Sequence, residues 1–179
     1  MKKLFEKNYT RIGILGGTFD PPHKGHLSIS KIVIKKLRLK KMMWVITKQN
    51  PLKGKPYLNI KKRIFWAKKM TNKEKKIYVK YYETKLKSSN TFSLLNYLKK
   101  NRKKEKLYFL IGEDNLEKFH KWFNWKKIPK LAKIVVFPRK NYSTKALRSI
   151  AFKKLDKKDF IFIKSKKINI SSSLIRKFW

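Results

Sequence analysis

The stretch that decides the fold is residues 12–27, which read IGILGGTFDPPHKGHL. It opens with apolar residues typical of a buried strand, passes through Gly16 and Gly17, and then reaches His23 and His26. Beyond it, apolar residues recur at helical spacing. Glycines allow a backbone to approach an anion closely, and a helix N-terminus offers unpaired N–H groups. The stretch therefore predicts a strand, a phosphate-binding turn and a helix whose start carries imidazoles.

Apolar runs and helical segments alternate along the rest of the chain, which predicts a parallel sheet covered by helices. We expect an α/β, Rossmann-like doubly wound fold in a single domain, 1–179. The expected strands are 10–15, 42–46, 77–82, 107–111, 134–137 and 160–163. The expected helices are 25–39, 58–70, 91–100, 113–120, 143–154 and a last one capped by Ser171, with 83–90 as a loop.

Polar and glycine-rich segments follow four of these strands. They are residues 16–26, 47–57, 83–94 and 112–125. Because the carboxyl ends of parallel strands meet at one edge of a sheet, these segments are expected to form one site there.

The composition is strongly basic, with 50 Lys and Arg against 10 Asp and Glu and a net charge of +40. This charge suits a nucleic-acid binder, but 43 of the cations are Lys and only 7 are Arg, spread over the whole chain. We interpret the charge mainly as composition bias that also favours anionic substrates. Cysteine is absent, no apolar run is long enough to span a membrane, and no signal peptide is visible, so we expect a cytoplasmic protein.

Two motifs resemble signatures of the nucleotidyltransferase superfamily. Residues 17–26, GTFDPPHKGH, resemble its G-[TS]-F-[DN]-P-x-H-x-G-H signature. Residues 170–176, ISSSLIR, resemble its I-S-S-T-x-I-R motif, with Ser173 where Thr is usual. The resemblance implies the superfamily's Rossmann-like fold and chemistry at the α-phosphorus of a nucleotide.

Later segments resemble the bacterial nicotinate-nucleotide adenylyltransferases in particular. Residues 109–128 are similar to that family's F-I-x-G-x-D-x-x-x-x-F-x-x-W-x-x-W-x-x-I segment, and 50–53 to its loop after the second strand. Residues 91–93, TFS, resemble its S-Y-T segment, with Phe92 for the usual Tyr. The family implies adenylyl transfer from ATP to nicotinate mononucleotide, which gives deamido-NAD and pyrophosphate in NAD biosynthesis.

The resemblance also implies residue roles. The catalytic residues would be His23, His26 and Arg176. ATP and its phosphates would be bound by Gly16, Gly17, Thr18, Phe19, Gly25, Gly112, Asp114, Ser172, Ser173 and Lys53. The nicotinate nucleotide would be bound by Thr91, Ser93, Leu94, Trp122 and Phe123. Trp122 would stack on the pyridine ring, and backbone N–H groups near Leu94 and Phe123 would meet the carboxylate. Mg²⁺ would be held by substrate phosphates rather than by side chains.

Other interpretations remain open from the residues. His23 and His26 could form a zinc pair, although His120 is the only other histidine and no cysteine exists. Trp122 and Trp125 could simply be core residues, and we interpret Asp20 as ordering the turn. The alternative functions are a related adenylyltransferase that uses nicotinamide mononucleotide or phosphopantetheine, and a non-enzymatic basic nucleic-acid-binding protein. We expect small-molecule partners, no specific nucleic acid, no membrane, and a monomer or homodimer.

Overall fold

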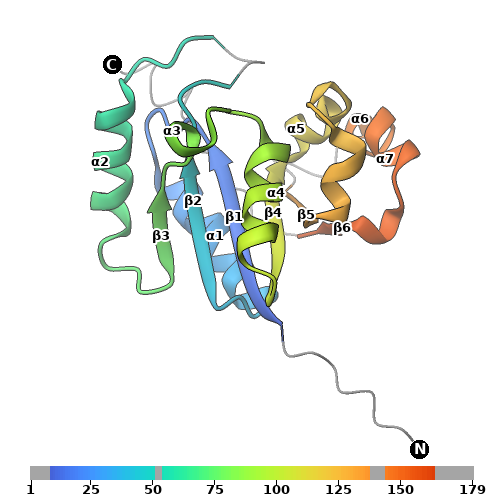
Figure 1. Cartoon of the computed structure of the whole chain (residues 1–179), viewed down its shortest axis with the longest axis horizontal. Helices are drawn as coiled ribbons and strands as arrows, with labels where there is room; N and C mark the ends of the chain where they lie inside the picture. Colours follow the sequence, from blue (N-terminus) through green and yellow to red (C-terminus); the bar gives the residue numbers. More distant parts are fainter. Residues whose placement is uncertain (1–8, 51–53, 138–143, 164–179) are drawn as a thin grey trace, which may run out of the picture.

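The fold is a six-stranded, all-parallel sheet with helices on both faces, seen in a computed structural model that describes residues 9–50, 54–137 and 144–163 (Figure 1). The strand order is β3-β2-β1-β4-β5-β6. The strands are β1 (Thr10–Gly17), β2 (Lys41–Ile46), β3 (Ile77–Lys80), β4 (Glu105–Gly112), β5 (Lys133–Phe137) and β6 (Phe160–Phe162). This arrangement confirms the predicted Rossmann-like doubly wound fold.

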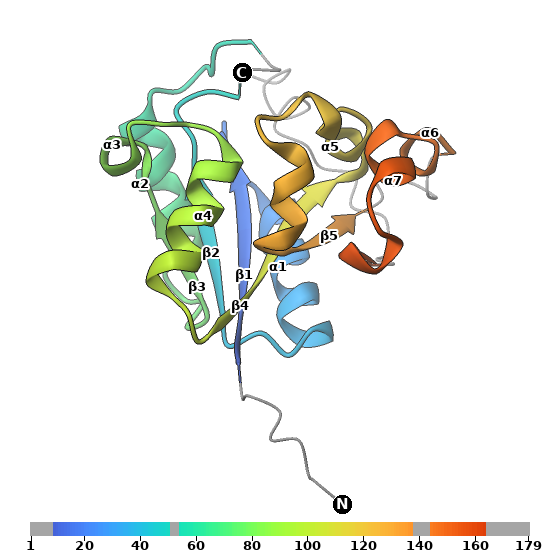
Figure 2. The same ribbon diagram turned by 45° about the vertical axis from the view of Figure 1, so that its right-hand side comes forward.

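The longer helices are α1 (Lys24–Lys36), α2 (Ile60–Thr71) and α4 (Thr91–Asn101). The short ones are α3 (Glu83–Leu86), α5 (Glu113–Glu117), η1 (Phe119–Lys121), η2 (Trp125–Lys130), α6 (Thr144–Leu147), α7 (Ile150–Lys154) and η3 (Lys157–Asp159). The helix α4 lies in front of the sheet and α1 behind it (Figure 2).

Alternate residues of each central strand face opposite layers, as a two-residue period requires. In β2, Met42, Trp44 and Ile46 pack with the α1 and α2 side, whereas Met43 and Val45 pack with the α4 side. Both faces of the strand are therefore buried, which explains why it reads as one continuous apolar run.

The strand register aligns the carboxyl ends of the central strands. Gly17 of β1 pairs with Ile46 of β2, and Gly112 of β4 pairs with Phe137 of β5. The order reverses between β1 and β4, because β2 and β3 lie on one side and β5 and β6 on the other. Ligands of such sheets bind outside the carboxyl ends at this switch point, so the segments after β1 and β4 define where a site should be.

Three expected elements need correction. The segment 83–90 was expected to be a loop, but it begins with the helix α3. Tyr82 just before this helix and Leu86 at its end both pack against the core, which holds the helical turn between them. The helix expected over 143–154 is broken at Ser149, whose backbone is extended and whose hydroxyl caps α7. The helix expected over 113–120 divides into α5 and η1. The last helix, expected at Ser171, lies outside the described residues.

Candidate active site

The chain leaves β1 at Gly17 and turns sharply into α1. Phe19 adopts a left-handed backbone (φ 49°), yet its side chain is only 2% exposed. A non-glycine residue tolerates this conformation when the surrounding packing fixes it. A Cβ added to Gly16 would lie 3.4 Å from the Phe109 ring, an ordinary van der Waals contact, so packing alone does not require glycine there. The burial of Phe19 is what fixes the turn at the switch point.

The two histidines form a reciprocal cap at the start of α1. The Gly25 N–H donates to Nδ1 of His23 (3.1 Å), and the His23 N–H donates to Nδ1 of His26 (3.2 Å). Because Nδ1 accepts in both rings, we assign the proton of each neutral imidazole to Nε2. The ring centroids are 3.8 Å apart, so the two imidazoles lie together at the helix N-terminus. Paired donors of this kind suit phosphate oxygens.

A buried aromatic frame supports His26. Its ring lies 4.6 Å from that of Phe19 and 5.9 Å from that of Trp44, measured between centroids. The Trp44 Nε1–H donates to the hydroxyl of Ser30 (2.8 Å), and that hydroxyl donates to the carbonyl of His26 (2.8 Å). Ser30 and Trp44 are fully buried. The imidazole therefore has little freedom to move away from its position in the turn.

Arg63 ties three segments of the site together, and the sequence analysis missed it. Its guanidinium donates to the carbonyls of Thr18 (2.7 Å), Thr47 (2.6 Å), Lys48 (2.8 Å) and Leu58 (2.9 Å). The residue is 2% exposed, and desolvation is the main cause that lowers its pKa. The turn after β1 is thereby fixed to the segments that follow β2 and precede α2.

A signal for Arg63 is present in the sequence. Ile60, Arg63, Ile64 and Ala67 share helical spacing, so the arginine occupies a position on the apolar face of α2. A cation on an apolar face requires buried partners. Those partners are main-chain carbonyls, which no sequence motif identifies.

Two carboxylates complete this network. Both oxygens of Asp20 accept main-chain N–H groups, from Tyr57 (2.7 Å) and Leu58 (2.8 Å). Asp20 is therefore structural, as interpreted, and it orders the approach to α2 as well as its own turn. Glu83 accepts the Lys48 N–H (2.9 Å), and desolvation raises the pKa of its carboxyl.

The end of β4 supplies a second part of the site. Gly112 is the N-terminal cap of α5, and Asp114 lies in the first turn of that helix. A Cβ at Gly112 would collide with the Asp114 carboxylate, so this position needs a glycine for the carboxylate to stand where it does. Glu113 beside them is 8% exposed, a buried acid that the sequence analysis did not single out.

The start of α4 faces the segment between η1 and η2. The ring of Phe92 lies 6.0 Å from that of Phe123, which is 59% exposed. Trp122 is half-buried against Phe109 (6.1 Å) and Phe119 (5.0 Å). The predicted stacking residue thus also contributes to the core.

The amides at the start of α4 are partly engaged. The Ser93 N–H donates to the side chain of Asn90 (2.8 Å) and the Leu94 N–H to its carbonyl (3.3 Å). The Leu94 amide, expected near a carboxylate, is therefore held here by a long helical hydrogen bond. Thr91 is the first residue of the helix.

Four predicted site residues, Lys53, Ser172, Ser173 and Arg176, lie outside the described residues. Among the residues that are described, no group of three or more His, Cys, Asp or Glu side chains could hold a metal ion. A search of the same residues finds no helix with the length and apolarity needed to cross a membrane.

Comparison with known proteins gives consistent matches. The Cytidylyltransferase-like family matches residues 14–178. A protein of Pelagibacter ubique named "Probable nicotinate-nucleotide adenylyltransferase" is 51% identical over 94% of this chain and 93% of its own. One of the same name from Aquifex aeolicus is 37% identical over 89% of this chain and 98% of its own.

Solved structures show the same fold. The nicotinic acid mononucleotide adenylyltransferase of Plasmodium falciparum, complexed with NaAD, superposes with a TM-score of 0.76. It is 22% identical and covers 95% of this chain and 84% of its own. From the fold, the family match and the close relatives together, the chain belongs to the Cytidylyltransferase-like family and, within it, to the nicotinate-nucleotide adenylyltransferases.

Proposed function

We propose that this protein transfers the adenylyl group of ATP to nicotinate mononucleotide by direct displacement at the site described above. The 5′-phosphate oxygen of the mononucleotide attacks the α-phosphorus of ATP. A new P–O bond forms between the α-phosphorus and this attacking oxygen. The bond between the α-phosphorus and the oxygen that bridges it to the β-phosphorus breaks, and pyrophosphate leaves with the bridging oxygen. The attacking phosphate is already an anion, so the step requires no general base and no nucleophilic side chain.

The observation that carries this proposal is the reciprocal cap of His23 and His26. Because both Nδ1 atoms accept main-chain N–H groups, Nε2–H is the donor of each ring, and we infer that it turns to the phosphates when ATP binds. Negative charge develops on the phosphate oxygens in the transition state, and preorganised donors stabilise it without reorganising. We assign His23 and His26 to the ATP phosphates, with Gly16, Gly17, Thr18, Phe19 and Gly25 forming the turn around them.

The remaining roles follow from the family resemblance and from position. Asp114, at the end of β4 beside Gly112, would accept a hydrogen bond from a ribose hydroxyl. Lys53, Ser172, Ser173 and Arg176 would hold phosphates and the leaving pyrophosphate. Mg²⁺ would neutralise charge on the triphosphate and be held by it.

For the acceptor, we propose that Trp122 and Phe123 lie against the pyridine ring and that Thr91, Ser93 and Leu94 present the start of α4 to its carboxylate. A carboxylate only accepts hydrogen bonds, so two amide donors suit it, whereas a carboxamide would point its NH₂ at one of them. The long bond of the Leu94 N–H to Asn90 (3.3 Å) is one that a carboxylate can replace.

We further propose a single domain acting in the cytoplasm as a monomer or homodimer. The experiment that tests the function is release of pyrophosphate by purified protein with ATP, Mg²⁺ and a panel of acceptors. Nicotinate mononucleotide should give the highest kcat/KM. Highest activity with nicotinamide mononucleotide or phosphopantetheine would reassign the substrate, and no release with any acceptor would refute the enzyme assignment.

A further inference from the structure

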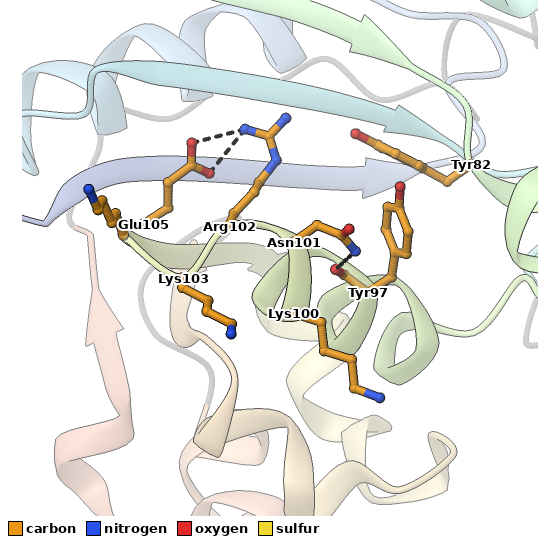
Figure 3. Close-up of a pocket in the computed structure, with 8 residues that line it drawn as sticks. Tyr82, Tyr97, Lys100, Asn101, Arg102, Lys103 and Glu105 are labelled. Carbon is orange, nitrogen blue, oxygen red and sulfur yellow. Dashed lines mark hydrogen bonds and ion pairs between the residues drawn. The ribbon is translucent and has the colours of Figure 1, made fainter.

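A cavity of about 600 Å³ lies away from the proposed catalytic loops, beside the end of α4 (Figure 3). It is lined by Tyr82, Tyr97, Lys100, Asn101, Arg102, Lys103, Lys104 and Glu105. Most of these residues end α4 or lead into β4, whereas the proposed site uses the opposite, carboxyl end of β4 at Gly112. Its volume is in the range of small-molecule sites.

The charge of the lining is unbalanced. Arg102 and Glu105 neutralise each other, because one guanidinium nitrogen of Arg102 contacts both carboxylate oxygens (2.9 and 3.1 Å). Lys100, Lys103 and Lys104 remain, all exposed, and none of them forms an ion pair with another described residue. These three lysines lie within five residues of one another along the chain, so a multivalent anion beside this segment can be attracted by more than one of them.

The other wall is aromatic. The rings of Tyr82 and Tyr97 lie 5.9 Å apart at an angle of 55°, and both are partly buried against the core. The side-chain amide of Asn101 donates to the Tyr97 carbonyl (2.8 Å), which fixes the end of the helix that carries the ring. Figure 3 shows both tyrosines at one end of the cavity and Lys103 and Glu105 toward the other. Aromatic rings on which bases stack and basic side chains that contact phosphates are combined in proteins that bind single-stranded nucleic acids. The Nζ atom of Lys85 lies 5.2 Å from the centroid of the Tyr97 ring, so a base would displace it or use the opposite side of the ring.

We propose that this cavity is a second nucleotide site, which takes a nucleoside di- or triphosphate with its base against Tyr82 and Tyr97 and its phosphates on Lys100, Lys103 and Lys104. The net charge of +40 attracts anions over the whole surface. Specific binding at this site would differ from that general attraction because the site also has an aromatic wall and a cavity between that wall and the lysines.

The test is titration of the protein with ADP, followed by calorimetric stoichiometry and by the amide NMR shifts of residues 97–105. The pocket variant is Lys100→Gln, Lys103→Gln, Lys104→Gln. The matched control removes the same charge from α1 and α2, which pack on the other face of the sheet, with Lys35→Gln, Lys61→Gln and Lys68→Gln, all at exposed positions. ADP should bind at two sites in the wild type and the control, and the pocket variant should bind the second ADP about tenfold more weakly.

Equal losses in the two triple variants would show attraction by net charge alone and would overturn the proposal. So would a titration in which the amides of residues 97–105 do not shift. Both readouts report binding, so their outcome is independent of whether adenylyl transfer is observed.

A second comparison tests the base. Pyrophosphate should bind this site about tenfold more weakly than ADP, because it has nothing to stack on the rings. Two separate variants, Tyr97→Leu and Tyr82→Leu, remove one ring each. Each should lower the affinity for ADP toward the affinity for pyrophosphate and leave the affinity for pyrophosphate unchanged. Equal affinity of the wild-type site for ADP and pyrophosphate would refute the assignment to a nucleotide.

Discussion

Replacing Arg63 by lysine tests how the catalytic turn is held. The guanidinium makes four hydrogen bonds of 2.6–2.9 Å to carbonyls in three segments. The ammonium group of a lysine has three N–H donors on one nitrogen, so at least one of the four carbonyls loses its donor. A hydrogen bond from a charged donor contributes about 1.5–3 kcal/mol. Arg63→Lys should therefore lower the free energy of unfolding by about 1.5 kcal/mol or more.

The activity of the same variant separates positioning from stability. Because Arg63 fixes the carbonyl of Thr18, next to the turn that carries His23, its loss should displace the phosphate site even in folded molecules. A displacement of about 1 Å can cost on the order of 100-fold in rate. We expect kcat/KM to fall at least about tenfold at a temperature where the variant remains folded.

The assays are urea denaturation and steady-state kinetics on Arg63→Lys and on a control, Arg148→Lys. Arg148 is exposed, so its replacement should change stability by less than about 0.5 kcal/mol. An Arg63→Lys protein as stable and as active as this control would refute the role given to the guanidinium network.

The other predictions concern single side chains. His26→Ala should lower kcat by about 10²–10³-fold with the fold intact by circular dichroism, as for loss of a preorganised donor; full activity or an unfolded protein would contradict the assigned role. Trp122→Ala should raise KM for the mononucleotide more than KM for ATP, and an equal rise in both would argue against stacking on the pyridine ring. Desolvation raises the pKa of Glu83 in the folded state, so folding favours the protonated carboxyl. The protonated form therefore contributes to the free energy of unfolding at low pH, and this contribution is lost as the pH rises through the folded-state pKa. Glu83→Gln should accordingly be more stable than wild type at pH 7, with the difference shrinking as pH falls toward the ordinary value of 4.5; a difference independent of pH would exclude this titration.

Much of the fold was predictable because burial leaves a strong pattern. The runs at 42–46 and 107–111 are apolar throughout, since both faces of β2 and β4 are covered, and they were correctly predicted as strands. The helix α3 was missed because four residues in a polar segment produce no readable periodicity. The break at Ser149 was missed because the sequence pattern does not distinguish a serine inside a helix from a serine that caps the start of a new one.

The site residues were predictable only where they form a recognisable sequence motif. The Gly-rich turn and its histidines lie together in sequence, and the structure keeps them together at the N-terminus of α1. The proton positions on these rings were not predictable, because they depend on which nitrogen meets a main-chain amide. Arg63 was hidden among 50 basic residues, and its partners are backbone atoms from segments distant in sequence.

The most direct test of the account is to follow the α-phosphorus of ATP. Purified protein is mixed with Mg²⁺, ATP labelled at the α-phosphate and nicotinate mononucleotide, and the products are separated. The account predicts that the label appears in deamido-NAD in an amount equal to the pyrophosphate released, with kcat/KM at least about tenfold lower for nicotinamide mononucleotide. Label recovered as AMP or bound to the protein, with no labelled dinucleotide, would contradict direct adenylyl transfer.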